Sequence, residues 1–346
     1  MRPEGESGTA DVRDHGGSLL KAQALFPHAP KPWIDLSTGI NPHSYPLPTI
    51  PATAWTRLPE PGDLRRLAEA AALAYGAPSA ENVICAPGTQ ILLPLVTGLA
   101  PPGVARVLSP TYAEHARAAR LAGHGVEEVE DFEALAGANL AVIVHPNNPD
   151  GRLFSAGRLL ALAAELRRCG GLLVVDEAFM DVAPAEHSVV EAVEEAGNLI
   201  VLRSFGKFFG PAGVRLGFAL ASKPLTRRIE AQLGPWAVSG PALVVGEAAL
   251  RDETWQRAML TRLKAEAAAL DRMLEAHGLA SAGGTSLFRF VRTPKAQAVF
   301  EACGRHGLYL RRFDAMPDAL RIGLPPDAEA LARLDVALGS IGRAAA

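Results

Sequence analysis

The sequence predicts an α/β fold, in which a mostly parallel sheet flanked by helices is followed by a smaller α+β C-terminal domain. Three observations lead to this prediction. The chain has 346 residues, which is long enough for two domains. From about residue 63 to residue 221, short apolar, β-branched runs alternate with amphipathic helical patterns, as in parallel sheets covered on both faces. After about residue 233 this alternation stops, and a long helical pattern leads into further strands.

Composition divides the chain into four parts. Residues 1–14 are polar and are predicted to form a disordered lead. Residues 15–62 are rich in proline, glycine and other turn-forming residues, which predicts an extended arm. Residues 63–233 are predicted to form the large, ligand-binding domain, and residues 234–346 the small C-terminal domain.

The large domain should begin with a helix and continue with alternating strands and helices. The first helical pattern starts at Asp63 and ends at Gly76, because glycine readily takes the left-handed conformation that closes a helix. The helices expected after it run from residue 89 through the nineties, over 111–123 and over 155–170. The expected strands are 82–86, 105–109, 140–146, 171–179, 198–205 and 213–221.

The small domain is predicted to begin with one long helix, roughly over residues 241–277. Three strands are expected after it, with helices between and after them. Their sequences are "SLFRFVR" (286–292), "LYLRRF" (308–313) and "ALRIGL" (319–324).

Charge and hydropathy exclude several classes of protein. The formal net charge is −3 and no basic run exceeds three residues, so no nucleic-acid partner is predicted. The N-terminus lacks the apolar core of a signal peptide, and the most apolar region, 91–104, is broken by prolines and glycines. We therefore expect a cytoplasmic protein with no membrane partner. The histidines show neither HxxxH nor HExxH spacing, so no metal site is predicted.

Chemically distinct residues follow the predicted strands, at the edge where doubly wound sheets bind ligands. Each has an ordinary explanation when taken alone: a turn, a packing residue or a helix cap. Together they supply backbone N–H groups at a helix start, an aromatic face, a side-chain amide, an acid, a hydroxyl, an amine and a guanidinium. They are Gly88, Thr89, Gln90, Tyr112, Asn147, Asn148, Asp176, Ser204, Lys207 and Arg215.

This set suits a planar, phosphorylated, cationic heteroaromatic aldehyde, which describes pyridoxal 5'-phosphate. Lys207 would form a Schiff base with the aldehyde. Asp176 would keep the ring nitrogen protonated, so that the ring withdraws electrons. Ser204 and Arg215 would bind the phosphate, the arginine as a charge-assisted fork. Lys207 and Asp176 are therefore the predicted catalytic residues, and the ring would lie among the others.

The chain resembles the fold-type I pyridoxal-phosphate enzymes, in the aminotransferase class that includes histidinol-phosphate aminotransferase. The resemblance covers nearly all of the chain after residue 15. The motifs that carry it are "PNNPDG" (146–151), "VVDEAF" (174–179) and "SFGKFFGPAGVRLGF" (204–218). It implies a fold-type I architecture and a homodimer with active sites at the subunit boundary.

Within that class, the chain looks most similar to the threonine-phosphate decarboxylases of cobalamin biosynthesis. Further matching stretches are "HGGSLLKAQ" (15–23), "IDLSTGINPHSYP" (34–46) and "GPWAVSGPALVVGEAAL" (234–250). This resemblance implies decarboxylation of O-phospho-L-threonine to (R)-1-amino-2-propanol O-phosphate. The alternative is an aminotransferase acting on histidinol phosphate or a related amino acid. A non-catalytic, pyridoxal-phosphate-binding regulator has less support, because such regulators usually carry a preceding DNA-binding domain.

The same resemblance implies a substrate pocket with several anion-binding side chains. Its residues would be His15, Gly16, Asn41, Asn148, Arg311 and Arg321. Arg312 alternates with Arg311 on a strand, so only one of the two can face the pocket, and the resemblance selects Arg311. The alternative for Arg321 is a structural ion pair, and the alternative for the "HGG" stretch is a simple turn.

Three positions depart from the pattern of the family. Many aminotransferases carry tyrosine where this chain has Phe179, which cannot donate to the ring oxygen and leaves Asn148 as its main partner. Aminotransferase relatives also carry tyrosine at the position of Leu58. The decarboxylases have asparagine where this chain has Gly39.

Overall fold

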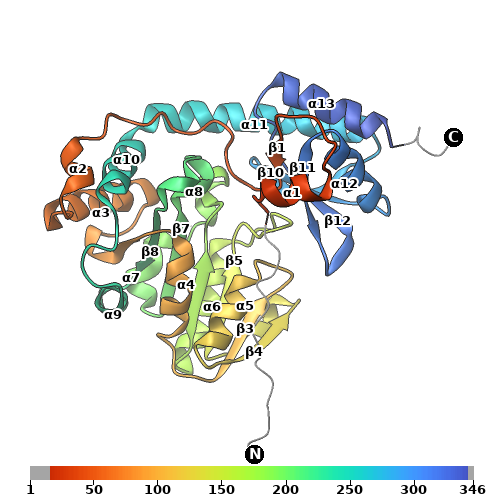
Figure 1. The fold of residues 1–346 in the computed structure, drawn as a ribbon. Coiled ribbons are helices and arrows are strands. Elements are labelled where there is room, and N and C mark those ends of the chain that lie inside the picture. Colours follow the sequence, from red (N-terminus) through yellow and green to blue (C-terminus); the bar gives the residue numbers. More distant parts are fainter. Residues whose placement is uncertain (1–15, 342–346) are drawn as a thin grey trace, which may run out of the picture.

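Two sheets organise residues 16–341, the part of the chain that the computed structural model describes (Figure 1). The larger sheet has seven strands in the order β2-β8-β7-β6-β5-β3-β4. The smaller has five strands in the order β1-β11-β12-β10-β9. Long α11 runs along the top of both parts in Figure 1 and connects them.

The large sheet is mostly parallel, as predicted. Strand β8 alone runs antiparallel to its neighbours β7 and β2, while β4, β3, β5, β6 and β7 pair in parallel. The central strands are continuous apolar runs buried along their whole length, which a sheet covered on both faces requires. The strands are β2 (Val83–Ala86), β3 (Val104–Leu108), β4 (Gly125–Val129), β5 (Leu140–Val144), β6 (Leu172–Asp176), β7 (Leu199–Ser204) and β8 (Gly217–Ala221).

Helices cover both faces of this sheet. The first of them, α3, begins with Pro61, and the side chains of Glu60 and Asp63 cap its start reciprocally. It ends at Gly76, which has a φ of 76°, as the sequence predicted. The α-helices of this part are α3 (Pro61–Tyr75), α4 (Thr89–Thr97), α5 (Glu114–Leu121), α6 (Ala156–Arg168), α7 (Val193–Ala196), α8 (Phe205–Phe208) and α9 (Lys223–Leu233).

Six short 3₁₀ helices complete the large part of the described chain. They are η1 (Ala80–Asn82), η2 (Phe132–Leu135), η3 (Met180–Val182), η4 (Ala185–His187), η5 (Val190–Ala192) and η6 (Ala212–Val214).

The core divides along the strands, because alternate residues point to opposite faces of the sheet. Val142, Val174 and Ile200 pack on the face covered by α4, α5 and α9. Ile143 and Val175 pack on the other face, in a cluster that continues into the small sheet. Among residues 16–341, no helix combines the length and apolar character needed to cross a bilayer.

The single long helix predicted over 241–277 is wrong. Two helices, α10 (Gly240–Arg251) and α11 (Glu253–Ala276), meet at Asp252. This residue leaves the helical conformation, with φ −89° and ψ 74°, and its side chain accepts a hydrogen bond from the Trp255 amide at 3.0 Å. Aspartate is a favoured N-cap, so it ends one helix and begins the next.

The rest of the C-terminal part is an antiparallel arrangement backed by two helices. Its elements are β9 (Ser281–Thr285), β10 (Phe288–Arg292), α12 (Ala296–Arg305), β11 (Leu308–Phe313), β12 (Met316–Gly323) and α13 (Ala328–Gly339).

The N-terminal arm contacts both sheets. It contains α1 (Leu19–Leu25), β1 (Ile34–Leu36) and α2 (Ala52–Thr56). Strand β1 pairs in parallel with β11 and so becomes an edge of the small sheet. Further along, the Asn41 amide donates to the Lys207 carbonyl at 2.9 Å, and the Tyr45 amide donates to the Phe209 carbonyl at 2.7 Å. The arm is thereby fixed to the segment that carries Lys207.

Candidate active site

An anion-binding corner forms where β7, β8 and the start of α4 meet. Gly88, with a φ of 87°, precedes Thr89, the first residue of α4. A Cβ on Gly88 would lie 2.7 Å from Arg215 Nη2, and a Cβ on Gly217 would lie 2.6 Å from the Thr89 amide nitrogen. Ser204 is the register partner of Gly217. Two glycines therefore let a guanidinium, a hydroxyl and a helix N-terminus converge, which suits a phosphate.

The backbone of Arg215 supports a functional role for this corner. Its φ of 57° is unusual for a residue other than glycine. Such a conformation costs about 1–3 kcal/mol and persists where the surroundings demand it. Here it turns the guanidinium back over Gly88, and Nη1 donates to the Ala212 carbonyl at 3.2 Å.

Tyr112 is held beside this corner by a polar network. Its hydroxyl donates to Gln90 Oε1 at 3.0 Å, and Gln90 Nε2 donates to Glu114 Oε2 at 3.0 Å. Burial, with Glu114 and Asp176 nearby, raises the pKa of Tyr112 to about 12, so the phenol stays neutral. The side chain of Gln90 thus holds the ring of Tyr112 beside the anion-binding corner.

Asp176 ends β6 in a buried setting. Its Oδ1 accepts from the Ala178 amide at 3.1 Å, and its Oδ2 lies 2.8 Å from Nε2 of the buried His115. His115 was not among the site residues predicted from the sequence. Its signal was a histidine at the start of the helix that follows Tyr112, and the two rings meet edge to face with centroids 5.9 Å apart.

The neighbouring acid, Glu177, has a different environment. Its carboxylate contacts Arg203 Nη1 at 2.9 Å, the Ser188 hydroxyl at 2.7 Å and the Val189 amide at 2.9 Å. Arg203 also donates to Asp181 and lies over the ring of Tyr75. This buried network is structural, so of the two adjacent acids Asp176 is the one available to a ligand.

Lys207 lies on the short helix α8, directly after β7. Removal from water and, to a smaller extent, the charge of Arg321 lower the pKa of its amine to about 8, while Asp176 acts in the opposite direction. The ammonium nitrogen is 5.6 Å from the ring centroid of Phe179. An amine with this pKa is neutral in about a tenth of the molecules at pH 7, far more than an ordinary lysine, and the neutral form is the one that bonds to an aldehyde.

Arg321 joins three parts of the molecule. Its Nη1 donates to Asn148 Oδ1 at 2.5 Å and its Nη2 donates to the Ser37 carbonyl at 2.7 Å. Its Nε is buried without a hydrogen-bond partner among residues 16–341. Burial and the nearby charge of Arg311 lower its pKa to about 10. The contacts of its guanidinium are to an amide and a carbonyl, so the charge can bind an anionic ligand.

The structure distinguishes Arg311 from Arg312. Arg311 is the register partner of Arg321, so both side chains lie on one face of the small sheet. Arg312 donates to Gln297 and lies over the ring of Phe300, both on α12. The two guanidinium groups therefore face the same side of the small sheet, and the charge of Arg321 acts on Lys207.

The predicted pocket residues of the arm take two positions. Asn41 is buried; its Nδ2 donates to the Phe208 carbonyl at 2.8 Å and its Oδ1 accepts from the His43 amide at 2.9 Å. This side chain holds the arm to the Lys207 segment. Gly16 lies against Ser37, since a Cβ there would be 2.6 Å from the Ser37 carbonyl oxygen that Arg321 also contacts. His15 lies outside the described residues.

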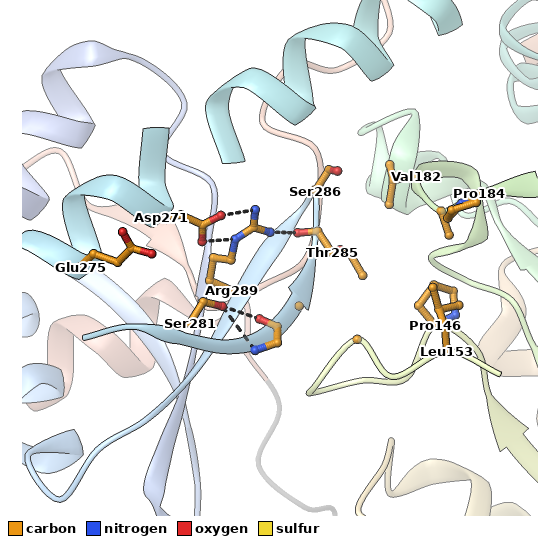
Figure 2. Close-up of a pocket in the computed structure, with 14 residues that line it drawn as sticks. Pro146, Leu153, Val182, Pro184, Asp271, Glu275, Ser281, Thr285, Ser286 and Arg289 are labelled. Atoms are coloured by element: carbon orange, nitrogen blue, oxygen red, sulfur yellow. Dashed lines mark hydrogen bonds and ion pairs between the residues drawn. The ribbon is translucent and has the colours of Figure 1, made fainter. Parts of the chain in front are cut away.

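A separate cleft of about 550 Å³ lies beside the loop that carries Asn148 (Figure 2). One wall comes from Pro146, Leu153 and Pro184, and the other from α11, β9 and β10. Across it, the Gly284 amide donates to the Asp150 carbonyl at 2.8 Å. Arg289, at the centre of the second wall, is paired with Asp271 through two contacts. Its charge is thus already matched within the chain.

The residues at the strand ends fit pyridoxal phosphate. Arg215 of the basic corner and Asp176 of the buried acid–histidine pair both act electrostatically on the amine of Lys207, whose pKa is lowered. The sequence profile described as Aminotransferase class I and II matches residues 49–337. The chain belongs to this family.

Individual relatives agree with the family. The chain is 46% identical to a threonine-phosphate decarboxylase of Pseudomonas aeruginosa, over 94% of this chain and 97% of that one. It is 43% identical to a threonine-phosphate decarboxylase of Sinorhizobium sp, over 93% and 98%. A histidinol-phosphate aminotransferase of Oleidesulfovibrio alaskensis is 31% identical, over 75% and 73%.

A solved structure supports the fold. The histidinol-phosphate aminotransferase of Sinorhizobium meliloti in complex with pyridoxal-5'-phosphate is similar with a TM-score of 0.74 and 24% identity, over 85% of each chain. These comparisons confirm the predicted family, fold class and cofactor.

Proposed function

We propose that this protein is a pyridoxal-phosphate-dependent decarboxylase of O-phospho-L-threonine, which forms (R)-1-amino-2-propanol O-phosphate and carbon dioxide for cobalamin biosynthesis. The observation that carries this proposal is Arg321, a buried guanidinium whose charge acts on Lys207 and whose hydrogen bonds go to the neutral oxygens of Asn148 and Ser37. A buried cation with neutral partners is stabilised by an anionic ligand, and a phosphorylated amino acid would supply one. Full-length similarity to two threonine-phosphate decarboxylases supports the same choice.

Each residue of the site has a role under this proposal. Gly88, Thr89, Ser204 and Arg215 would hold the phosphate of the cofactor, and Tyr112 would cover its ring. The bound cofactor supplies an electron-withdrawing ring next to the reacting carbon. Asn148 accepts from Arg321 through Oδ1, which leaves its Nδ2 to donate to the ring oxygen.

The remaining residues act on the proton and on the substrate. Asp176, oriented by His115, would hold a proton on the ring nitrogen. Arg311 and Arg321, with His15 and Gly16 of the arm, would bind the two anionic groups of the substrate. Fixing both groups can turn the carboxylate out of the ring plane, so that its bond to the α-carbon overlaps the ring electrons.

We also propose that the protein is a cytoplasmic homodimer that works without nucleic acid, membrane or metal. Large apolar side chains are exposed on α2 and on the loop before α10, including Trp55 and Trp236, 66% and 59% exposed. These segments adjoin, since a Cβ on Gly240 would lie 2.2 Å from the Ala54 carbonyl oxygen. Such a patch is typical of an interface. Residues 63–233 and 234–346 are the large and small domains in this proposal.

The reaction is tested by two incubations of the purified protein. One contains O-phospho-L-threonine, and the other contains histidinol phosphate with 2-oxoglutarate; carbon dioxide and glutamate are assayed in both. We expect carbon dioxide in the first and no glutamate in the second. A Lys207→Ala variant should release none. Glutamate without carbon dioxide would overturn the proposal and favour the aminotransferase.

A further inference from the structure

Phe179 and Phe288 form a buried ring pair between the two sheets. Phe179 follows β6, whereas Phe288 begins β10. Their centroids are 5.1 Å apart at an interplanar angle of 77°, an edge-to-face arrangement, and the side chains are 3% and 0% exposed. The pair therefore joins the part that carries Lys207 to the part that carries Arg321.

A cation lies at each end of this ring pair. Lys207 Nζ is 5.6 Å from the Phe179 centroid, and Arg321 Cζ is 5.2 Å from the Phe288 centroid. Both distances are within the range of cation–π attraction. Phe288 and Phe290 are two residues apart on β10, so their side chains lie on the same face of the sheet. Phe290 is the register partner of Arg321, which makes Phe288 a diagonal neighbour of Arg321 on that face.

At Gly39 the backbone of the N-terminal arm packs against both rings. A Cβ at this position would lie 2.8 Å from Phe288 Cδ1 and 2.9 Å from Phe179 Cε1. The φ of Gly39 is not in the left-handed region, so space rather than backbone conformation requires glycine here. Two positions later, Asn41 ties the arm to the Lys207 segment, and two positions earlier the Ser37 carbonyl accepts from Arg321.

We propose that Gly39, Phe179 and Phe288 form one interlocked unit that positions Arg321 and Lys207, and that any side chain at position 39 displaces both cations. In this chain the unit forms an apolar wall between the amine and the anion-binding guanidinium.

The test is a double-mutant cycle on the protein with its cofactor fixed by borohydride, which binds ligand without turnover. Calorimetry measures the Kd of O-phospho-L-threonine for the parent protein, Gly39→Ala, Phe288→Leu and the double variant. We expect Gly39→Ala to weaken binding about tenfold in the parent and about threefold or less in the Phe288→Leu background. Gly157→Ala is the matched control, because a Cβ there meets no atom within 4 Å.

A second readout does not depend on the substrate. In the unreduced protein, the pH midpoint of the absorbance of the bound cofactor reports the environment of Lys207. We expect Gly39→Ala to shift this midpoint and Gly157→Ala to leave it unchanged. If Gly39→Ala fails to fold, Phe288→Leu alone must weaken binding about fivefold, with recovery in Phe288→Tyr.

Failure of this inference can be distinguished from failure of the proposed function. Only the binding measurement assumes the proposed substrate, whereas the absorbance measurement does not. Equal effects of Gly39→Ala in both backgrounds, or no effect on either readout, overturn the interlocked unit. A parent protein that neither binds nor decarboxylates O-phospho-L-threonine overturns the proposed function, while the absorbance midpoints still decide the inference.

Discussion

Lys207 owes its chemistry to its surroundings. Burial lowers the pKa of its amine from 10.5 to about 8. Between these values the unfolded chain binds more protons than the folded chain, so this group makes folding more favourable as pH rises through that window. We expect the rate at which cofactor-free protein takes up pyridoxal phosphate to rise with pH, with a midpoint near 8. Stopped-flow absorbance measures this rate, and a midpoint near 10.5 would contradict the environment described.

The attachment site of the cofactor is a separate test of the same residue. Borohydride reduction followed by peptide mass mapping should place the cofactor on Lys207. Lys223 is the internal control, since it is exposed and paired with Glu81 at 2.7 Å. A label on Lys223 would show that Lys207 is not the lysine that binds the cofactor.

Asp176 illustrates which part of a site the sequence can predict. The acid could be predicted because it ends a buried strand, whereas its 2.8 Å contact with His115 depends on how α5 packs against β6. We expect Asp176→Asn to keep cofactor binding but to lower turnover at least about a hundredfold, since ring protonation is worth several kcal/mol. Steady-state kinetics with absorbance spectra check this, and near-normal turnover would show that another group holds the proton.

Arg321 and Arg312 offer a matched comparison on neighbouring strands. Removing a charge that binds an anion costs about 2–5 kcal/mol, so Arg321→Ala should raise KM about thirtyfold or more, a far larger change than in cofactor affinity. Arg312→Ala removes a guanidinium that contacts α12, and it should leave KM within about twofold. Equal KM values in the two variants would exclude Arg321 from the substrate pocket.

At the scale of elements, the sequence predicted strands that are long and buried and missed those that are not. Strand β1 has three residues, β4 reads "GVEEV" and β9 reads "SAGGT". Short, charged or glycine-rich strands carry little β-signal, and they form because a neighbouring strand supplies the pairing. The break at Asp252 was missed because the helical sequence pattern is strong on both sides of it. The pattern continues across Asp252, although aspartate is a favoured N-cap.

Asp252 therefore gives a prediction at this scale. Its carboxylate caps α11 through the Trp255 amide and lies 3.3 Å from the Tyr45 hydroxyl. Asp252→Ala should lower the free energy of unfolding by about 1–2 kcal/mol. Urea denaturation followed by circular dichroism measures the change. Asp314→Ala, on an exposed turn, should stay within about 0.5 kcal/mol of the parent, and an equal loss in both variants would argue against the cap.

At the scale of the whole molecule, the site depends on the arm, the large sheet and the small sheet meeting at Arg321, which contacts Ser37 and Asn148 at once. The sequence identified Arg321 and Asn148 as separate residues of one pocket. Their direct contact could not be predicted, because it depends on how the small sheet sits over the strand ends. The same holds for the arm, whose composition indicates an extended segment but not the sheet that it joins.

The exposed patch on α2 and the loop before α10 leads to the last prediction. Trp55, Leu58 and Trp236 are 66%, 64% and 59% exposed, and leaving such side chains in water forgoes about 2 kcal/mol each. We expect the parent protein to elute with twice the mass of the chain in light scattering. The double variant Trp55→Ser/Trp236→Ser should shift it toward monomer. Val336→Ser is the control, because Val336 is 62% exposed on α13, far from α2 in Figure 1. Dimers that persist in the tryptophan variant would place the interface elsewhere.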